Sequence, residues 1–179
     1  MQRLFIVVLS ALALASCAQG PTGPGGTAVS DYEPPLAAGS TFEVRDFTWS
    51  TVKGDGSISG ALTYHQGAAR FSCHGSDVLL TPETPWSRRR MIVLYGSASV
   101  AAAPVSIVRA RTPSAGAGDY ARFVRRTTCD SASHFSFNDL PNGSWFVITV
   151  GKSIEGAGEP IAVTRRVETH GGPVNMSLP

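Results

Sequence analysis

Hydrophobic and polar residues alternate along most of the chain from Ser40 onward, with the period of two that is typical of strands with one buried face. The clearest stretch is 57–64, where Ile58, Leu62 and Tyr64 alternate with smaller residues. The same pattern predicts strands over 42–52, 77–81, 105–111, 120–129, 134–140, 144–152, 161–170 and 173–178. Clusters of Gly, Pro, Asn and Asp separate these stretches, and helices do not alternate with them. We therefore expect an all-β fold, either an antiparallel β-sandwich or a barrel.

One short inserted helix interrupts the strand pattern. Thr84 can cap its start, Pro85 suits the first helical position, and Gly96 can end it, so the helix body is expected over 86–95. The small-residue runs 97–103 and 115–118 predict loops. In 145–150 both faces are apolar, which predicts a central strand.

The N-terminus has the anatomy of a secretory signal. A positive stretch (1–3) precedes an apolar run (4–14) that is too short to span a bilayer, since a spanning helix needs about 20 residues. Residues 14–17, Leu-Ala-Ser-Cys, resemble the lipobox of bacterial lipoproteins. This resemblance implies cleavage after a signal peptide of residues 1–16, acylation of Cys17 and contact with membrane lipid. Ala18 rather than Asp follows Cys17, which favours the outer membrane within the cell envelope, either periplasm-facing or surface-exposed.

Between the expected anchor and the strands lies a segment without apolar periodicity. Residues 18–39 include five Gly and four Pro, which predicts a flexible tether over 17–39 that spans about 25 Å. The β-sandwich is then expected over 40–179.

Cys73 and Cys129 remain as an even pair in an oxidising compartment, so we expect a disulfide. Cys73 follows the short run 69–72, and Cys129 ends an expected strand, so both lie where strands leave the sandwich. A bond between them would stabilise the fold by roughly 4 kcal/mol on the chain-entropy model. The alternatives are two free buried thiols, or a zinc site of Cys73, His74, Cys129 and His134. Neighbours in a strand point to opposite faces, which argues against zinc.

The net charge and the positions of the arginines indicate which classes of binding partner to expect. The 179 residues carry a net charge of +2, and this balance removes the strongest argument for a nucleic-acid partner. Arginines gather on two of the expected strands, 105–111 and 120–129. If these strands pair, they form a stripe beside 165–166 that could bind an anionic envelope glycan or glycolipid, and its members are Arg109, Arg111, Arg122 and Arg126. A solvated face balanced by acidic residues is the alternative.

Three segments carry a family resemblance: 56–62 (GSISGAL), 78–82 (VLLTP) and 135–145 (FSFNDLPNGSW). They resemble the carboxypeptidase regulatory-like domain. This resemblance implies an antiparallel, prealbumin-like β-sandwich of Greek-key type over about 56–179, rather than a barrel, and a non-catalytic role. The segment 82–104 departs from that family, because it inserts the helix and a long loop.

The sequence contains none of the common hydrolase or phosphate-binding motifs, which agrees with a non-catalytic role. The chain contains no His-Glu-x-x-His helix, no Gly-x-Ser-x-Gly elbow and no phosphate-binding loop. We expect no cofactor, no metal and no enzyme activity. The chain is then an envelope lipoprotein that acts as a structural or interaction module, with an envelope protein or a glycan as its partner. A glycan-binding protein is the alternative, and an enzyme without a known motif is the third.

Overall fold

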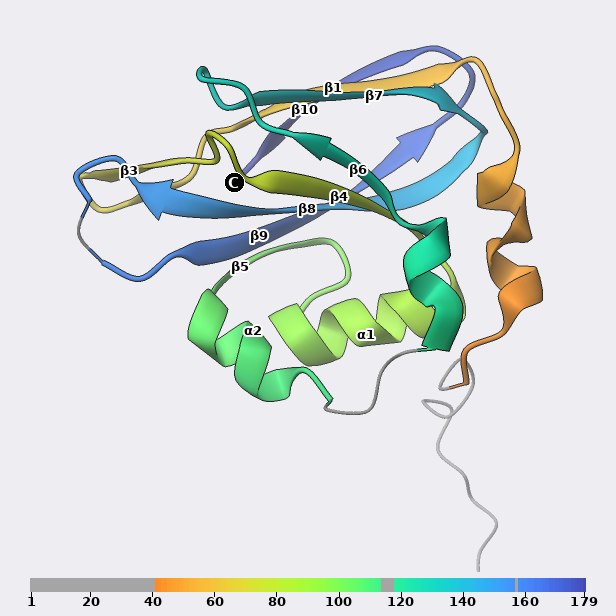
Figure 1. Ribbon diagram of the computed structural model, residues 1–179, viewed down its shortest axis with the longest axis horizontal. Coiled ribbons are helices and arrows are strands. Elements are labelled where there is room, and N and C mark those ends of the chain that lie inside the picture. The colour runs from red at the N-terminus through yellow and green to blue at the C-terminus, as the bar shows by residue number, and fades with distance from the viewer. Residues whose placement is uncertain (1–40, 114–117, 157) are drawn as a thin grey trace, which may run out of the picture. The chain divides into compact units, whose positions relative to one another are not determined.

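Ten strands form two sheets in the part of the chain that the computed structural model describes, residues 41–113, 118–156 and 158–179 (Figure 1). The strands are β1 (Gly56–Leu62), β2 (His65–Gln66), β3 (Ala69–Ser72), β4 (Asp77–Pro82), β5 (Val100–Pro104), β6 (Arg125–Thr128), β7 (His134–Leu140), β8 (Gly143–Ser153), β9 (Ile161–Thr169) and β10 (Pro173–Leu178). The helical segments are η1 (Val44–Thr51), α1 (Pro85–Tyr95), α2 (Val105–Arg111) and η2 (Gly118–Phe123). The predicted signal peptide, Cys17 and tether lie outside the described residues.

The prediction of a β-sandwich is confirmed. The small sheet has the order β10-β1-β7, and the large sheet is built around β8, which pairs with β3, β4 and β9. The central position expected for 145–150 is therefore correct. Every pair is antiparallel except β1 with β10, which run parallel and bring Ser57 beside Pro173.

The main core fills the space between the two sheets. Odd-numbered residues of β8 such as Trp145 and Val147 are fully buried there, against Ile58 and Leu178 of the small sheet. This is the buried face that alternation predicts for each strand.

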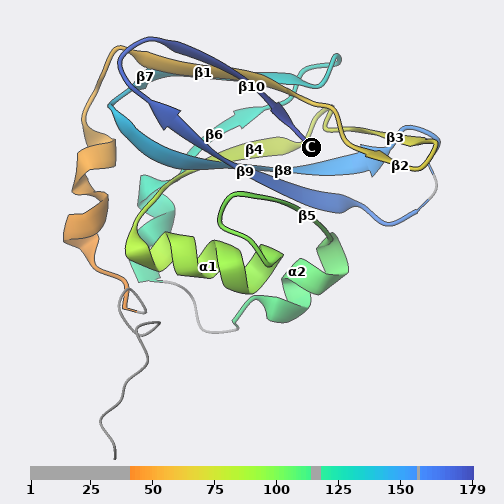
Figure 2. The same cartoon turned by 180° about the vertical axis from the view of Figure 1, so that it is seen from behind.

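A helical layer covers the other face of the large sheet (Figures 1 and 2). Even-numbered residues of β8, Phe146 and Ile148, form a second core with Met91 of α1 and Ala98. The predicted helix is confirmed in detail. Thr84 and Ser87 make a capping box, and Gly96 ends the helix in the left-handed conformation at φ 82°.

Two expected strands are helical instead. The prediction of a strand over 42–52 is wrong, because η1 forms there and buries Phe47 and Ser50 three residues apart. Its hydroxyls support the turn: Ser50 donates to the Phe47 carbonyl at 2.7 Å, and Thr51 to the Thr48 carbonyl at 2.8 Å.

The prediction of a strand over 105–111 is also wrong, because α2 occupies that segment. Val105 and Val108, three residues apart, are both half-buried, which fits one face of a helix. A short β-branched run does not distinguish the two structures by periodicity alone.

Two further boundaries differ. The stretch 120–129 divides into the end of η2 and the short strand β6, so Arg122 and Arg126 belong to different elements. The expected loop 97–103 contains most of β5, which extends the large sheet beside β9. The loop expected at 115–118 lies largely outside the described residues.

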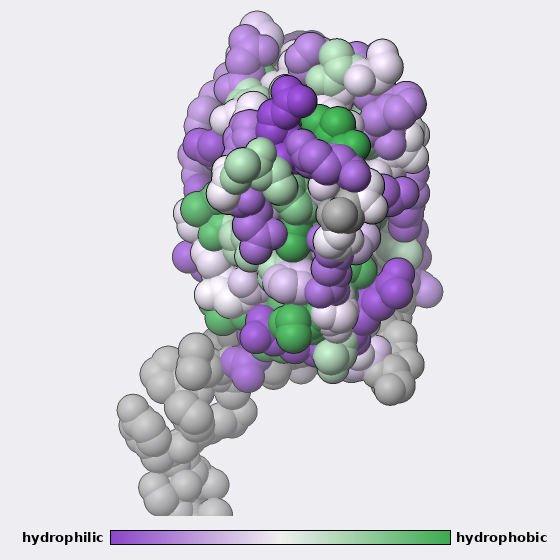
Figure 3. Space-filling view, turned by 90° about the vertical axis from the view of Figure 1, so that its left-hand side faces the viewer, coloured by the Kyte–Doolittle hydropathy of each residue, from purple (hydrophilic) through white to green (hydrophobic). Residues whose placement is uncertain are grey.

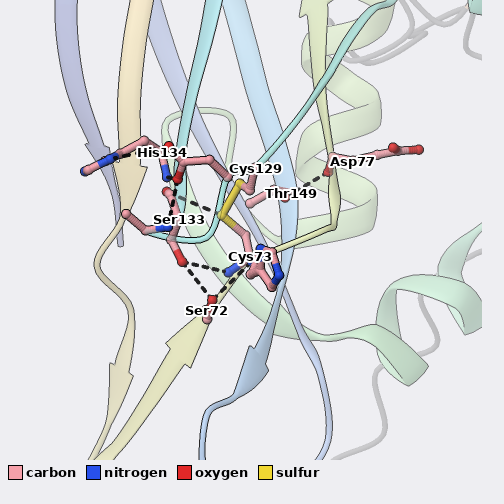
Figure 4. Close-up of a disulfide and its surroundings, with 10 residues drawn as sticks. Ser72, Cys73, Asp77, Cys129, Ser133, His134 and Thr149 are labelled. Atoms are coloured by element: carbon pink, nitrogen blue, oxygen red, sulfur yellow. Dashed lines mark hydrogen bonds and ion pairs between the residues drawn. A yellow bond between two sulfur atoms is a disulfide. The ribbon is translucent and has the colours of Figure 1, made fainter.

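The predicted disulfide is confirmed. Cys73 and Cys129 are bonded at the ends of β3 and β6, with Cα atoms 5.7 Å apart (Figure 4). Both are buried, and the Ser133 hydroxyl accepts a hydrogen bond from the Cys73 backbone N–H at 3.2 Å. The bond joins an edge of the large sheet to the loop that leads into β7.

None of the helices within 41–113, 118–156 and 158–179 has the length and apolar character that a membrane crossing needs.

A candidate anion-binding cleft

A cleft of about 530 Å³ lies between α2 and the outer face of the large sheet. Its apolar lining comes from Leu79 of β4, Ile148 and Val150 of β8, and Val105 and Val108 of α2. Leu79 and Val150 are only partly buried, so the helical layer leaves this end of the sheet incompletely covered.

Three cations from three elements line the same cleft: Arg109 of α2, Arg126 of β6 and Lys152 of β8. Asp77 is the one carboxylate in the lining, and it pairs with Arg126 at 3.7 Å in an exposed geometry. No ion pair within the described residues engages Arg109 or Lys152. The cleft therefore carries an excess of two positive charges.

Tyr95, at the end of α1, adds a phenol to the lining. Burial and, to a smaller extent, the nearby Tyr120 raise the pKa of Tyr95 to about 12, although Arg90 opposes the shift. The Tyr95 hydroxyl consequently stays protonated at neutral pH and can donate a hydrogen bond.

This arrangement suits a ligand with an apolar face and anionic groups. Pockets that bind small molecules are mainly apolar, with a few polar groups that fix orientation. Guanidinium groups bind carboxylate or phosphate with two parallel hydrogen bonds, whereas Lys acts as a point charge. The apolar floor would contact the body of such a ligand, and the three cations would bind its acidic substituents.

The structure brings together two of the four arginines that the sequence suggested. Arg109 and Arg126 share the cleft, whereas Arg111 and Arg122 do not line it. Arg111 donates to the Leu94 carbonyl at 3.3 Å. Arg122 pairs with Asp119 at 3.7 Å and lies over the Phe123 ring.

The predicted stripe on paired strands is therefore wrong, because 105–111 is a helix in which residues two apart point in different directions. The two arginines of β9 are also engaged elsewhere. Arg166 binds Glu83, Glu168 and the Ser144 hydroxyl, which raises the pKa of Arg166, and Arg165 donates to the Ser177 carbonyl at 2.8 Å.

Sequence reasoning missed Lys152 and Tyr95. Lys152 has the same parity as Phe146, Ile148 and Val150, so the alternation in β8 already placed it on the helix-covered face. No sequence signal connects Tyr95 to the cleft, because its position depends on how α1 crosses the sheet.

The disulfide is incompatible with the zinc site that the sequence left as an alternative. Both sulfurs of the four-ligand set are bonded to each other, and His134 lies 3.8 Å from Asp130 in an exposed pair. The described residues contain no cluster of three or more His, Cys, Asp or Glu side chains that could hold a metal. Cys17 lies outside the described residues, so its lipidation stays a prediction.

Comparisons with known proteins add one finding. No family model matches the chain, and no curated protein matches it. Among solved structures, the chain is similar to the crystal structure of a candidate carbohydrate binding protein from Pseudomonas aeruginosa. The alignment covers 76% of this chain and 96% of that one, with 22% identical residues and a TM-score of 0.55. The similarity shows the fold.

Proposed function

We propose that this protein is a lipid-anchored protein of the cell envelope whose β-sandwich binds an anionic glycan in the cleft of Arg109, Arg126 and Lys152. The observation that carries the binding role is that three separate elements bring cations to one cleft with an apolar floor. Cys17, within its lipobox, is the proposed attachment point for lipid, with the outer membrane as the favoured location.

Two further observations support binding rather than catalysis. The protein of similar fold is a candidate carbohydrate binding protein, which agrees with a glycan ligand. The resemblance to carboxypeptidase regulatory-like domains in 135–145 also implies a non-catalytic module.

The binding role is tested by retention on an immobilised polyuronate, with immobilised dextran as the neutral comparison. A double variant, Arg109→Gln with Arg126→Gln, should lose most of the salt-sensitive retention. Each charged hydrogen bond contributes about 1.5 kcal/mol or more, so the apparent affinity should fall about tenfold for each arginine.

The chain offers a control with matched charge. Arg111→Gln with Arg122→Gln removes the same two charges outside the cleft and should keep retention close to that of the unaltered protein. Equal losses in the two double variants would show that net charge, not the cleft, retains the protein. Absence of retention on the polyuronate would leave a structural or interaction module as the better description.

The anchor is tested separately in cells. Cys17→Ser should move the protein from the membrane to the soluble fraction or leave it unprocessed, because acyl chains contribute about 0.8 kcal/mol for each buried CH₂. The mature mass of the unaltered protein should include the acyl groups. Unchanged partition and an unmodified mass would contradict lipidation.

A further inference from the structure

The helical layer carries a strong local charge. The segment 85–111 contains five Arg and no Asp or Glu, so its net charge is +5. The whole chain has a net charge of +2, so the other residues together sum to 2 − 5 = −3. The positive charge of this protein is therefore concentrated in one layer of the fold.

The same layer exposes large aliphatic side chains. Ile92 and Val93 of α1 are 48% and 51% exposed, Val100 of β5 is 46% exposed, and Ile107 of α2 is 41% exposed. They are four of the seven large hydrophobic residues that are exposed among the described residues. Figure 3, which views the end where α2 lies, shows hydrophobic groups interspersed with hydrophilic ones rather than one continuous apolar area.

Arginines stand between these aliphatic residues on α1. Arg89 is exposed, and no ion pair within the described part of the chain engages it. Arg88 is also exposed and pairs with Glu83 at 2.6 Å. Exposed aliphatic groups interleaved with cations are typical of surfaces that lie in the interface of an anionic membrane.

The chain enters the domain beside this layer. Phe42, at the start of the described residues, packs against Trp86 in the first turn of α1, with ring centroids 5.5 Å apart. A tether that begins at a lipidated Cys17 would reach the domain within 24 residues of that contact (42 − 17 − 1). The described chain thus enters the domain on the same side as the helical layer (Figure 1).

We infer that the outer surface of the helical layer, formed by Arg88, Arg89, Ile92, Val93 and Ile107, docks on a bilayer that contains anionic phospholipid. This inference rests on the proposed lipidation, which would keep the domain within reach of that bilayer. Docking would hold the sandwich in one orientation on the membrane.

The cleft and the docking surface use different sides of α2. Val105, Val108 and Arg109 line the cleft, whereas Ile107 points in another direction, because successive helical residues are rotated by about 100°. A glycan and the membrane could therefore be bound at the same time.

The test uses the mature chain, residues 17–179, with Cys17→Ser so that no acyl group contributes. Flotation with vesicles of equal parts phosphatidylglycerol and phosphatidylcholine is compared with flotation with phosphatidylcholine alone. We expect binding to the anionic vesicles that weakens as salt is added. Arg88→Gln with Arg89→Gln should lower the partition coefficient about fivefold per arginine, which corresponds to about 1 kcal/mol for each basic residue near an anionic surface.

A second variant, Ile92→Ser with Val93→Ser, should also lower binding, but without changing its salt dependence. The matched control removes an exposed Arg and an exposed Ile at the β3 and β8 ends, through Arg70→Gln with Ile154→Ser. Equal binding to both kinds of vesicle would overturn the inference, as would losses in the control as large as those in the α1 variants. Because this chain lacks the acyl groups, either outcome is independent of whether Cys17 is lipidated, which the mature mass decides.

Discussion

The two faces of the large sheet differ in what covers them and in what they carry. The inner face packs against a second sheet, and its larger side chains, such as Trp145, Val147 and Val163, are fully buried. The outer face is covered by α1 and α2, which leave a cleft and an exposed basic surface. The inner face therefore contributes most of the stability of the fold. The groups that are available to a ligand lie on the outer face.

The difference between the faces arises within one part of the chain. The helical layer and β5 come from one continuous segment, 85–111, which lies between β4 and β6 in the sequence. The two strands pair with each other although this segment and η2 separate them. A long connection between paired strands can therefore cover one face of a sheet without contributing to the core on the other face.

The largest expected effect is at Trp145 on the inner face. Its side chain is fully buried, its ring packs against Trp49 with centroids 4.9 Å apart, and its indole N–H donates to the Thr169 hydroxyl at 3.2 Å. Trp145→Ala should lower the free energy of unfolding by about 4 kcal/mol, measured by urea titration. Trp145→Phe keeps most of the packing and should cost less than half as much. Equal costs for the two variants would contradict a role in core packing.

The second effect concerns the disulfide that joins the large sheet to the loop before β7. Replacing both Cys73 and Cys129 with Ala should lower the free energy of unfolding, because the unfolded chain regains the freedom that the cross-link removes. We expect a loss of roughly 3 kcal/mol, below the roughly 4 kcal/mol of the chain-entropy model, because measured losses are often smaller than that model gives. In the Cys17→Ser variant, thiol labelling should give no adducts before reduction and two after it. Full labelling without reductant would show that the bond is absent.

A smaller effect of opposite sign is expected at Thr164, beneath the helical layer. Its hydroxyl is buried and has no hydrogen-bond partner among the described residues. Thr164→Val replaces this group with a methyl of similar shape and should raise the free energy of unfolding by about 1 kcal/mol. Thr149→Val is the informative comparison, since the Thr149 hydroxyl donates to the Asp77 carbonyl and its removal should destabilise the fold.

The smallest effect on stability is expected in the cleft. Arg109→Gln and Lys152→Gln should each change the free energy of unfolding by no more than about 0.5 kcal/mol, because both side chains are exposed and unpaired among the described residues. Urea titration of the two single variants gives this measurement. A loss of several kcal/mol would mean that these residues maintain the outer face rather than serve a ligand.

The contrast between the faces also explains which features the sequence could predict. Strands β7 to β10, the capping of α1 by Thr84 and the end of α1 at Gly96 follow from local patterns, so they were predicted close to their true bounds. The disulfide followed from the even pair Cys73 and Cys129 and from the positions of strand ends.

The helical segments other than α1 depend on contacts that no local pattern contains. Residues 44–51 become helical because Phe47 packs between elements far apart in the sequence, against Phe42, Trp86 and Phe123. For the same reason, only two of the three cations in the cleft could be predicted from the sequence. Arg109 and Arg126 were identified by residue type, but their meeting with Lys152 depends on the position of α2 over the sheet.

The parallel pairing of β1 with β10 has a consequence for the order in which the fold assembles. Residues 57 and 173 are partners, so 116 positions separate the two halves of this ladder (173 − 57). The small sheet cannot close until β10 is available, and pairing over such a separation is slow because a long loop must first be closed. Both cysteines precede β10 in the chain, so the cross-link between residues 73 and 129 can form while Ile58 and Leu62 still await Leu178. During synthesis, closure of the sandwich therefore depends on the last strand of the chain.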